Sequence, residues 1–206
     1  MLFRSRGSEI RITPEGFRLR TPRHEHCLGD AFPAAHQRHN ALVAVRVLEE
    51  ILDAGVRFDL HRAVAGLASV RWPGRLEWVP GEPPLLLDGA HNSAAAAALV
   101  DYLRPLGSFV LLFGIMADKN VEEVARLLFP LARRIVLTRT RAGRAAPTIE
   151  IVKRSGDLAT SARRQAQPRR ALALARSLAR PGEPVVVAGS LYLVGEVKRI
   201  LGGPSH

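Results

Sequence analysis

Three polar residues, Asp88, His91 and Asn92, have types and a spacing that could bind a nucleotide. They lie in residues 84–99, which read PLLLDGAHNSAAAAAL. The apolar run predicts a strand and the alanine-rich run predicts a helix, joined by a tight turn. In parallel α/β sheets, ligands bind where a strand ends and the next helix begins. Asp88 could accept hydrogen bonds from the hydroxyls of a ribose, with His91 and Asn92 beside the phosphates.

The same corner also has a purely structural interpretation. Asp88 could do no more than cap the turn between the strand and the helix. Ser93 is a residue type that caps helices well, and it could cap the helix that follows. The residues of the stretch leave both interpretations of Asp88 open.

Two residues elsewhere in the chain suit the same ligand. Arg75 follows Pro73 and Gly74, so we expect it on a turn, where a guanidinium would suit phosphate oxygens. Asn40 lies in the first turn of an amphipathic helix predicted over residues 37–52. Its side-chain amide could read the edge of a planar heterocycle through one donor and one acceptor. Simple solvation of the helix start is the alternative for Asn40.

The N-terminal part of the chain predicts a small hairpin followed by helices. Residues 1–20 alternate apolar and polar side chains around the turn sequence Thr13-Pro14-Glu15-Gly16. An isolated hairpin is marginal in water, so we expect the rest of its sheet to lie outside this chain. A second helix is predicted to begin after Asp59 as its N-cap.

The C-terminal part predicts a mainly parallel α/β fold. Apolar runs at 109–113, 135–138 and 184–188 predict strands, and helical patterns separate them. Near-continuous apolar strands indicate a Rossmann-like sheet with helices on both faces. Proline and glycine are densest between residues 71 and 82, where we place a domain boundary.

Composition indicates a soluble, cytoplasmic protein with neither membrane nor nucleic-acid partners. No apolar run approaches the roughly 20 residues of a membrane span, and the N-terminus lacks the apolar segment of a secretory signal. The net charge is +11, and eleven basic against two acidic residues lie between Arg139 and Arg180. This segment lacks interleaved aromatic side chains, so we expect a solvated face.

His24, His26 and Cys27 are residue types that bind metals. No CxxC pair or second ligand pair stands at a familiar spacing, so the sequence predicts no metal site here. Cys27 is also the only cysteine, which excludes an internal disulfide.

Five motifs occur in order along the chain: His36-Gln37-x-x-Asn40-Ala41, Trp72-Pro73-Gly74-Arg75-Leu76-Glu77, Asp88-Gly89-Ala90-His91-Asn92, Asp118-Lys119 and Gly189-Ser190-Leu191-Tyr192-Leu193-Val194-Gly195-Glu196-Val197. Together they resemble the C-terminal half of the folylpolyglutamate synthase/dihydrofolate synthase family, within the Mur ligase superfamily. The resemblance covers residue 37 to about residue 201. It implies a remnant of a central ATPase domain over 1–72 and a glutamate ligase domain over 73–206.

The resemblance implies an ATP-dependent ligase. Such an enzyme activates a carboxylate of folate or dihydropteroate as an acyl phosphate, which the amine of L-glutamate then attacks. By this resemblance, Asn40 would meet the adenine, Arg75 the phosphates and Asp88 the ribose of ATP. His91 would lie near the nucleotide.

The resemblance also implies residues for glutamate and for catalysis. Lys119 and Ser190 would line the side where glutamate enters. Arg75, His91 and Lys119 would serve catalysis, because positioned cations stabilise the charge of a transferred phosphoryl group.

No GxxxxGK[ST] phosphate-binding loop occurs in the 206 residues. We therefore expect this chain alone to be inactive, with the P-loop and the magnesium ligands on an N-terminal half. One alternative is a non-catalytic nucleotide-binding or interaction module derived from a Mur ligase C-terminal domain. Another is a fragment of a peptidoglycan Mur ligase, although the ending over residues 189–197 favours the folate branch.

Overall fold

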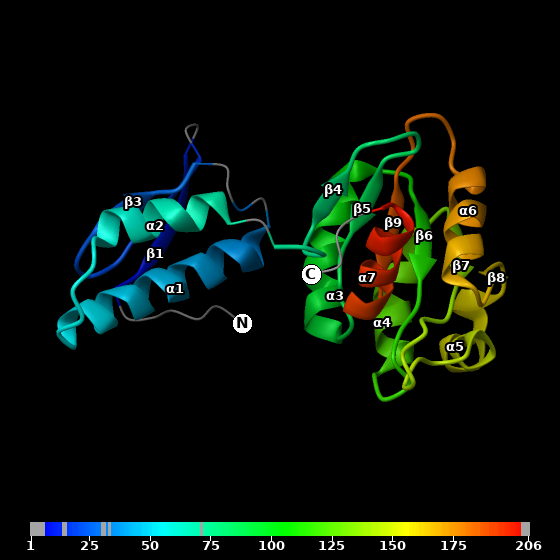
Figure 1. The fold of residues 1–206 in the computed structure, drawn as a ribbon. Coiled ribbons are helices and arrows are strands. Elements are labelled where there is room, and N and C mark those ends of the chain that lie inside the picture. The colour runs from blue at the N-terminus through cyan, green and yellow to red at the C-terminus, as the bar shows by residue number, and fades with distance from the viewer. Residues whose placement is uncertain (1–6, 14–15, 30–31, 33, 71, 203–206) are drawn as a thin grey trace. The chain divides into compact units, whose positions relative to one another are not determined.

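The computed structural model describes residues 7–13, 16–29, 32, 34–70 and 72–202. The chain divides into two compact units, residues 1–71 and 72–206, which are described separately (Figure 1). Pro14 and Glu15 of the predicted hairpin turn lie outside the described residues.

The first unit packs two helices on a three-stranded antiparallel sheet. The strands are β1 (Glu9–Thr13), β2 (Gly16–Arg20) and β3 (Glu25–Cys27), in the order β1-β2-β3. The helices are α1 (Ala35–Asp53) and α2 (Leu60–Ser69). Their core contains the side chains of Phe17, Leu19, Leu28, Ala41, Leu42, Val45, Leu60 and Val64.

The hairpin of the first unit and the cap of α2 match their sequence predictions. Asp59 is the N-cap of α2, and its side chain accepts a hydrogen bond from Arg62 N. The expectation that the rest of the sheet lies outside the chain is wrong for one strand, because β3 pairs with β2. Strand β3 has only three residues and begins with a charged one, so its sequence shows too little periodicity to predict a strand.

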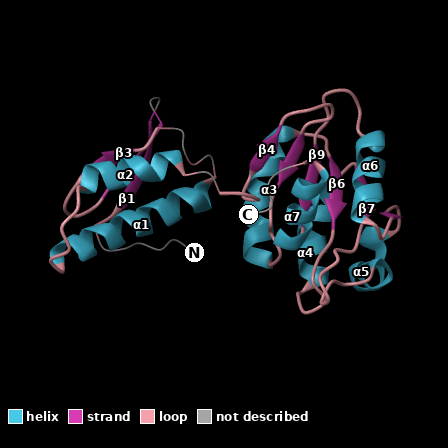
Figure 2. Ribbon diagram, viewed as in Figure 1, coloured by secondary structure: helices cyan, strands magenta, loops and turns pink. Residues whose placement is uncertain are grey.

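The second unit contains a six-stranded sheet. Its strands are β4 (Glu77–Val79), β5 (Leu85–Leu87), β6 (Val110–Phe113), β7 (Arg134–Leu137), β8 (Arg163–Arg164) and β9 (Val185–Ala188). They lie in the order β4-β5-β9-β6-β7-β8 (Figure 2). Only β4 pairs antiparallel within this sheet, which confirms the mainly parallel α/β fold.

Helices cover both faces of this sheet. They are α3 (Ser93–Leu103), α4 (Val121–Leu128), α5 (Thr148–Ser155), α6 (Pro168–Leu178) and α7 (Leu191–Ile200). Helices α6 and α7 pack on one face, and their core side chains meet those of β5, β6 and β9. Helices α3 and α4 lie behind the sheet in the view of Figure 1. Within the described ranges, no helix is both long and apolar enough to span a bilayer.

Strand β4 lies where the sequence predicts only a linker rich in proline and glycine. Its three residues stand between Pro73-Gly74 and Pro80-Gly81, so no periodic pattern marks them. Pairing of Trp78 with Leu86 gives the strand its place at the edge of the sheet.

Candidate functional site

The parallel strands of the second unit all end at one edge of the sheet. Strands β5, β9, β6 and β7 pair in register, so the loops that follow them start side by side. Backbone pairing continues past the strand ends, where Asp88 N donates to Val187 O at 2.9 Å. Thr138 N likewise donates to Phe113 O at 2.8 Å. The residues after each strand are therefore held in fixed positions at the edge where α/β proteins bind ligands.

Two glycines allow the loops at this edge to approach one another. A Cβ on Gly89 would lie 2.3 Å from Leu191 Cδ2, at the start of α7. Gly189 has a φ of +102°, and a Cβ there would lie 2.7 Å from Gly114 O. A side chain at Gly189 would force the loops apart, whereas one at Gly89 would displace the side chain of Leu191.

Asp88 holds the turn together through both of its carboxylate oxygens. Oδ2 accepts a hydrogen bond from Leu76 N at 3.0 Å, and Oδ1 accepts one from Ala90 N at 2.8 Å. The residue is 5% exposed. Leu76 has a φ of +50°, in the left-handed region that costs energy for a residue with a side chain. Hydrogen bonds to the carboxylate help to hold Leu76 in that conformation.

The same network positions Arg75. Gly89 N donates to Gly74 O at 2.8 Å, and Arg75 N donates to Trp72 O at 3.1 Å, so backbone bonds fix the residues on both sides. The side chain of Arg75 is half-buried. Its guanidinium makes no hydrogen bond or ion pair to any residue that the structure describes. A positioned cation with unused donors is therefore available to an anionic ligand.

His91 and Asn92 have different tasks at the start of α3. His91 Nδ1 lies 2.8 Å from Gly89 O, and since a carbonyl only accepts, Nδ1 carries the proton and Nε2 can accept. Asn92 is the N-cap of α3, and its Oδ1 accepts from Ala95 N at 2.9 Å. The prediction that Ser93 caps this helix is wrong, because Ser93 is already its first helical residue.

Ser190 and Lys119 lie on the loops that follow β9 and β6. Ser190 is the buried N-cap of α7, and its Oγ accepts a hydrogen bond from Tyr192 N at 3.1 Å. Lys119 Nζ lies 3.2 Å from a carboxylate oxygen of Asp118, and this contact is the main cause that lowers the pKa of Asp118. Arg154 donates to the backbone carbonyl of Lys119 and fixes its loop.

Asn40 lies in the other unit. It is exposed in the first turns of α1, within the predicted helix. The second unit thus gathers Arg75, Asp88, His91, Lys119 and Ser190 at one edge of its sheet, and Asn40 is not among them.

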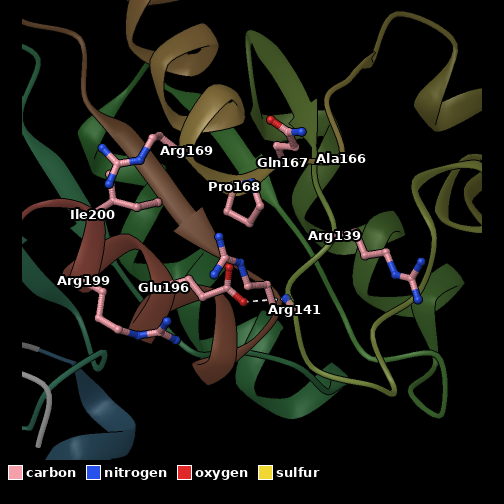
Figure 3. A pocket seen from close by; sticks show the side chains of 9 residues that line it. All are labelled: Arg139, Arg141, Ala166, Gln167, Pro168, Arg169, Glu196, Arg199 and Ile200. Carbon is pink, nitrogen blue, oxygen red and sulfur yellow. Dashed lines mark hydrogen bonds between the residues drawn. The ribbon is translucent and has the colours of Figure 1, made fainter.

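Sequence reasoning missed a basic pocket at the same sheet edge (Figure 3). It has a volume of about 550 Å³ and lies beside the ends of β7 and β8 and the start of α6. Its lining residues are Arg139, Arg141, Ala166, Gln167, Pro168, Arg169, Glu196, Arg199 and Ile200. Buried Glu196 accepts a hydrogen bond from Arg141 N at 2.6 Å.

The guanidiniums of this pocket are not neutralised by protein contacts. They belong to Arg139, Arg141, Arg169 and Arg199. None of these four guanidiniums makes a hydrogen bond or ion pair to the part of the chain that the structure describes. In Figure 3, the guanidinium of Arg141 points toward Pro168, whereas that of Arg139 extends away. The pocket suits anionic groups. The excess of arginine over residues 139–180 was the feature of the sequence that pointed to this pocket. Only the fold brings Arg199 close to that segment.

Comparisons with known proteins identify relatives of this chain. Residues 74–191 match the family described as Mur ligase, glutamate ligase domain. The dihydrofolate synthase/folylpolyglutamate synthase of Mycobacterium tuberculosis is 36% identical over 115 residues, which are 53% of this chain and 24% of that protein. The dihydrofolate synthetase of Saccharomyces cerevisiae is 31% identical over 187 residues, covering 80% of this chain and 44% of that protein.

A solved structure has the same fold. The Mycobacterium tuberculosis folylpolyglutamate synthase, complexed with ADP and AMPPCP, superposes with a TM-score of 0.78 at 26% identity. The match covers 96% of this chain and 48% of that one. This chain therefore spans less than half the length of each of these three relatives.

Proposed function

This chain belongs to the Mur ligase family through its glutamate ligase domain, and we propose that it forms the glutamate-adding part of a folylpolyglutamate synthase/dihydrofolate synthase. In the proposed reaction, ATP converts a carboxylate of folate or dihydropteroate into an acyl phosphate. The amine of L-glutamate attacks the acyl carbon and phosphate leaves. The names of the relatives and the ADP in the Mycobacterium tuberculosis structure support this assignment.

The observation that carries the proposal is the way in which Asp88 holds the turn that bears Arg75. Catalysis of phosphoryl transfer depends on cations that are positioned before the charge develops. Arg75 is such a cation, since backbone bonds fix its neighbours and no described residue engages its guanidinium. We assign it to the phosphates of ATP.

Asp88 also fits a contact with the ribose. It directly follows β5 at the sheet edge where α/β proteins bind ligands, and a carboxylate accepts hydrogen bonds from hydroxyl groups such as those of a ribose. Nε2 of His91 is free to accept a proton from a group near the nucleotide.

Lys119 and Ser190 are assigned to the carboxylates of the incoming glutamate. Ser190 Oγ accepts a backbone N–H, so its hydroxyl proton remains available to a ligand. Lys119 is half-exposed and shares Asp118 with Arg144, which leaves donors for a second anion. An ammonium and a hydroxyl are suitable groups for an amino-acid carboxylate.

The remaining parts of the site are assigned outside the second unit. We propose that residues 1–72 are a remnant of the central ATPase domain, with Asn40 against the adenine, and that 73–206 are the ligase domain. Magnesium would be held by residues of a P-loop half. The one group of histidine and acidic side chains close enough to share a metal, among the described residues, lies in the first unit and includes none of these site residues.

A second candidate function is a nucleotide-binding module without turnover. The lack of a GxxxxGK[ST] loop in the 206 residues favours it for this chain in isolation. Both candidates predict nucleotide binding at the same sheet edge, and only the ligase predicts glutamate-dependent turnover in a completed enzyme.

The test is an assembly of this chain with the part of the Mycobacterium tuberculosis synthase that it does not match. The measurement is glutamate-dependent phosphate release from ATP with folate or dihydropteroate. We expect release only with both halves, and a loss of about 100-fold or more in Arg75→Ala. Arg126→Ala is the matched control, because Arg126 pairs with Glu122 on the exposed face of α4.

Each result of this test has a definite meaning. Nucleotide binding without release in the assembly would favour the module. Release that is indifferent to Arg75→Ala would contradict the assignment of Arg75. Release from the 206-residue chain alone would contradict its expected inactivity.

A further inference from the structure

Three side chains of metal-binding types converge in the first unit, and none of them is among the residues assigned to ligation. His26 lies on β3, His24 in the turn before it and Glu49 on α1. One ring nitrogen of each histidine and one carboxylate oxygen of Glu49 all lie within 4.8 Å of one another. Cys27, the third member of the sequence cluster, is exposed, since neighbours on a strand point to opposite faces. The fold replaces it with Glu49.

Glu49 is a buried carboxylate held by polar side chains. It is 1% exposed. Oε1 accepts from Thr21 Oγ1 at 2.6 Å and lies 3.2 Å from His24 Nδ1, and Oε2 accepts from Arg46 at 2.6 Å. These contacts fix the carboxylate of Glu49 beside the two histidines.

His26 is buried without a full set of partners. The residue is 5% exposed, and its Nε2 has no hydrogen-bond partner among the residues described. A buried polar atom left without a partner costs roughly 1–3 kcal/mol. The unpartnered nitrogen of this buried ring is therefore available to a ligand within the first unit.

We propose that His24, His26 and Glu49 bind a divalent transition metal ion, with Zn²⁺ as the best fit and water as the fourth ligand. Two imidazoles and one carboxylate form a donor set that suits zinc and disfavours magnesium and calcium, which prefer oxygen ligands. Ligands at about 2.1 Å from a tetrahedral ion lie about 3.4 Å apart. The 3.2 Å between His24 Nδ1 and Glu49 Oε1 is close to that value.

The surroundings of the three residues resemble the outer shell of a metal site. The hydroxyl of Thr21 and the guanidinium of Arg46 orient the two oxygens of Glu49, as hydrogen-bonded groups orient carboxylate ligands. The ion would connect β3 and the turn before it with α1. Its effect is structural stabilisation of that unit, a role separate from the proposed ligase function.

The test is a titration of the metal-free 206-residue chain with Zn²⁺ by calorimetry, and with Co²⁺ by visible absorption. We expect one ion per chain, a d–d spectrum typical of tetrahedral Co²⁺, and a higher melting temperature with Zn²⁺. His24→Ala and His26→Ala should each weaken binding by at least tenfold. Because His24 is half-exposed, its variant is expected to keep the fold, which circular dichroism checks.

Two control variants make the test specific. His39→Ala removes an exposed histidine of α1 whose Nδ1 contacts Ala35 O, and Cys27→Ser removes the thiol. Neither change should affect binding. No binding at equimolar Zn²⁺, binding that survives both histidine variants, or binding that is lost with Cys27→Ser would each overturn the proposal.

Discussion

The two units of this chain bury their apolar surfaces to different extents. In the second unit, every residue of β5, β6 and β9 is buried, and helices cover both faces of the sheet. In the first unit, α1 leaves Val43, Val47 and Ile51 exposed at intervals of four residues, which is one stripe of a helix. The second unit closes its own core, whereas α1 keeps an uncovered apolar face. This difference supports our proposal that the first unit is part of a larger domain.

The largest expected effect comes from the closed core of the second unit. Leu111 is fully buried on the central strand β6. Leu111→Ala should lower the free energy of unfolding of this unit by about 2–5 kcal/mol, through lost burial and a cavity. Val47→Ala on the exposed stripe should change stability by no more than about 0.5 kcal/mol. Urea denaturation measures both, and equal effects would contradict the contrast between the units.

The second prediction concerns the ion pair of half-buried Arg133 with buried Glu183. Arg133 donates to both oxygens of Glu183, and Ser108 and Arg180 N donate as well. The bonds from Arg133 are the main cause that lowers the pKa of Glu183 from 4.5 to about 2, against the opposing effect of burial. A carboxyl group with a lowered folded-state pKa adds stability above its unfolded pKa and loses it as the pH falls.

The second unit should therefore lose about 3 kcal/mol of stability as the pH falls from about 5 toward 2 through this group. Glu183→Gln should be less stable at neutral pH and should lack this part of the pH dependence. Chemical denaturation at several pH values measures the difference between the two proteins. Parallel pH curves for wild type and variant would contradict the role of Glu183.

The smallest expected effect separates two adjacent residues at the start of α3. Asn92→Ala removes the N-cap and should lower stability by about 1 kcal/mol. Ser93→Ala should change stability by less than about 0.5 kcal/mol, because its side chain caps nothing. Thermal unfolding of the two variants distinguishes them, and the reverse order would restore the sequence-based assignment of the cap to Ser93.

The sequence predicts the second unit better than the first, for a physical reason. Strands β5, β6, β7 and β9 are apolar runs, because both faces of a parallel sheet are covered, and such runs can be recognised locally. Strands β3 and β4 have three residues each, and long-range pairing defines them. Boundaries of the longer elements shift by only one or two residues from the prediction.

The residues of the candidate sites also differ in how well the sequence predicts that they meet. The turn at Asp88 is visible in the sequence because strand, turn and helix are contiguous there. The meeting of Glu49 with His24 and His26, and of Arg199 with Arg141, depends on contacts between distant segments. Such contacts leave no local pattern in the sequence. The cap at Asn92 was missed because both Asn and Ser cap helices well.

We propose that the sheet edge at Asp88 faces the nucleotide, and an amide NMR titration of the 206-residue chain with ATP is the test. We expect shifts at residues 74–76 and 88–91 that disappear in Arg75→Ala but persist in Arg141→Ala. Arg75→Ala should keep its melting temperature, since no described residue depends on that guanidinium. Shifts confined to the basic pocket and lost with Arg141→Ala, or no shifts at all, would contradict the proposed nucleotide site.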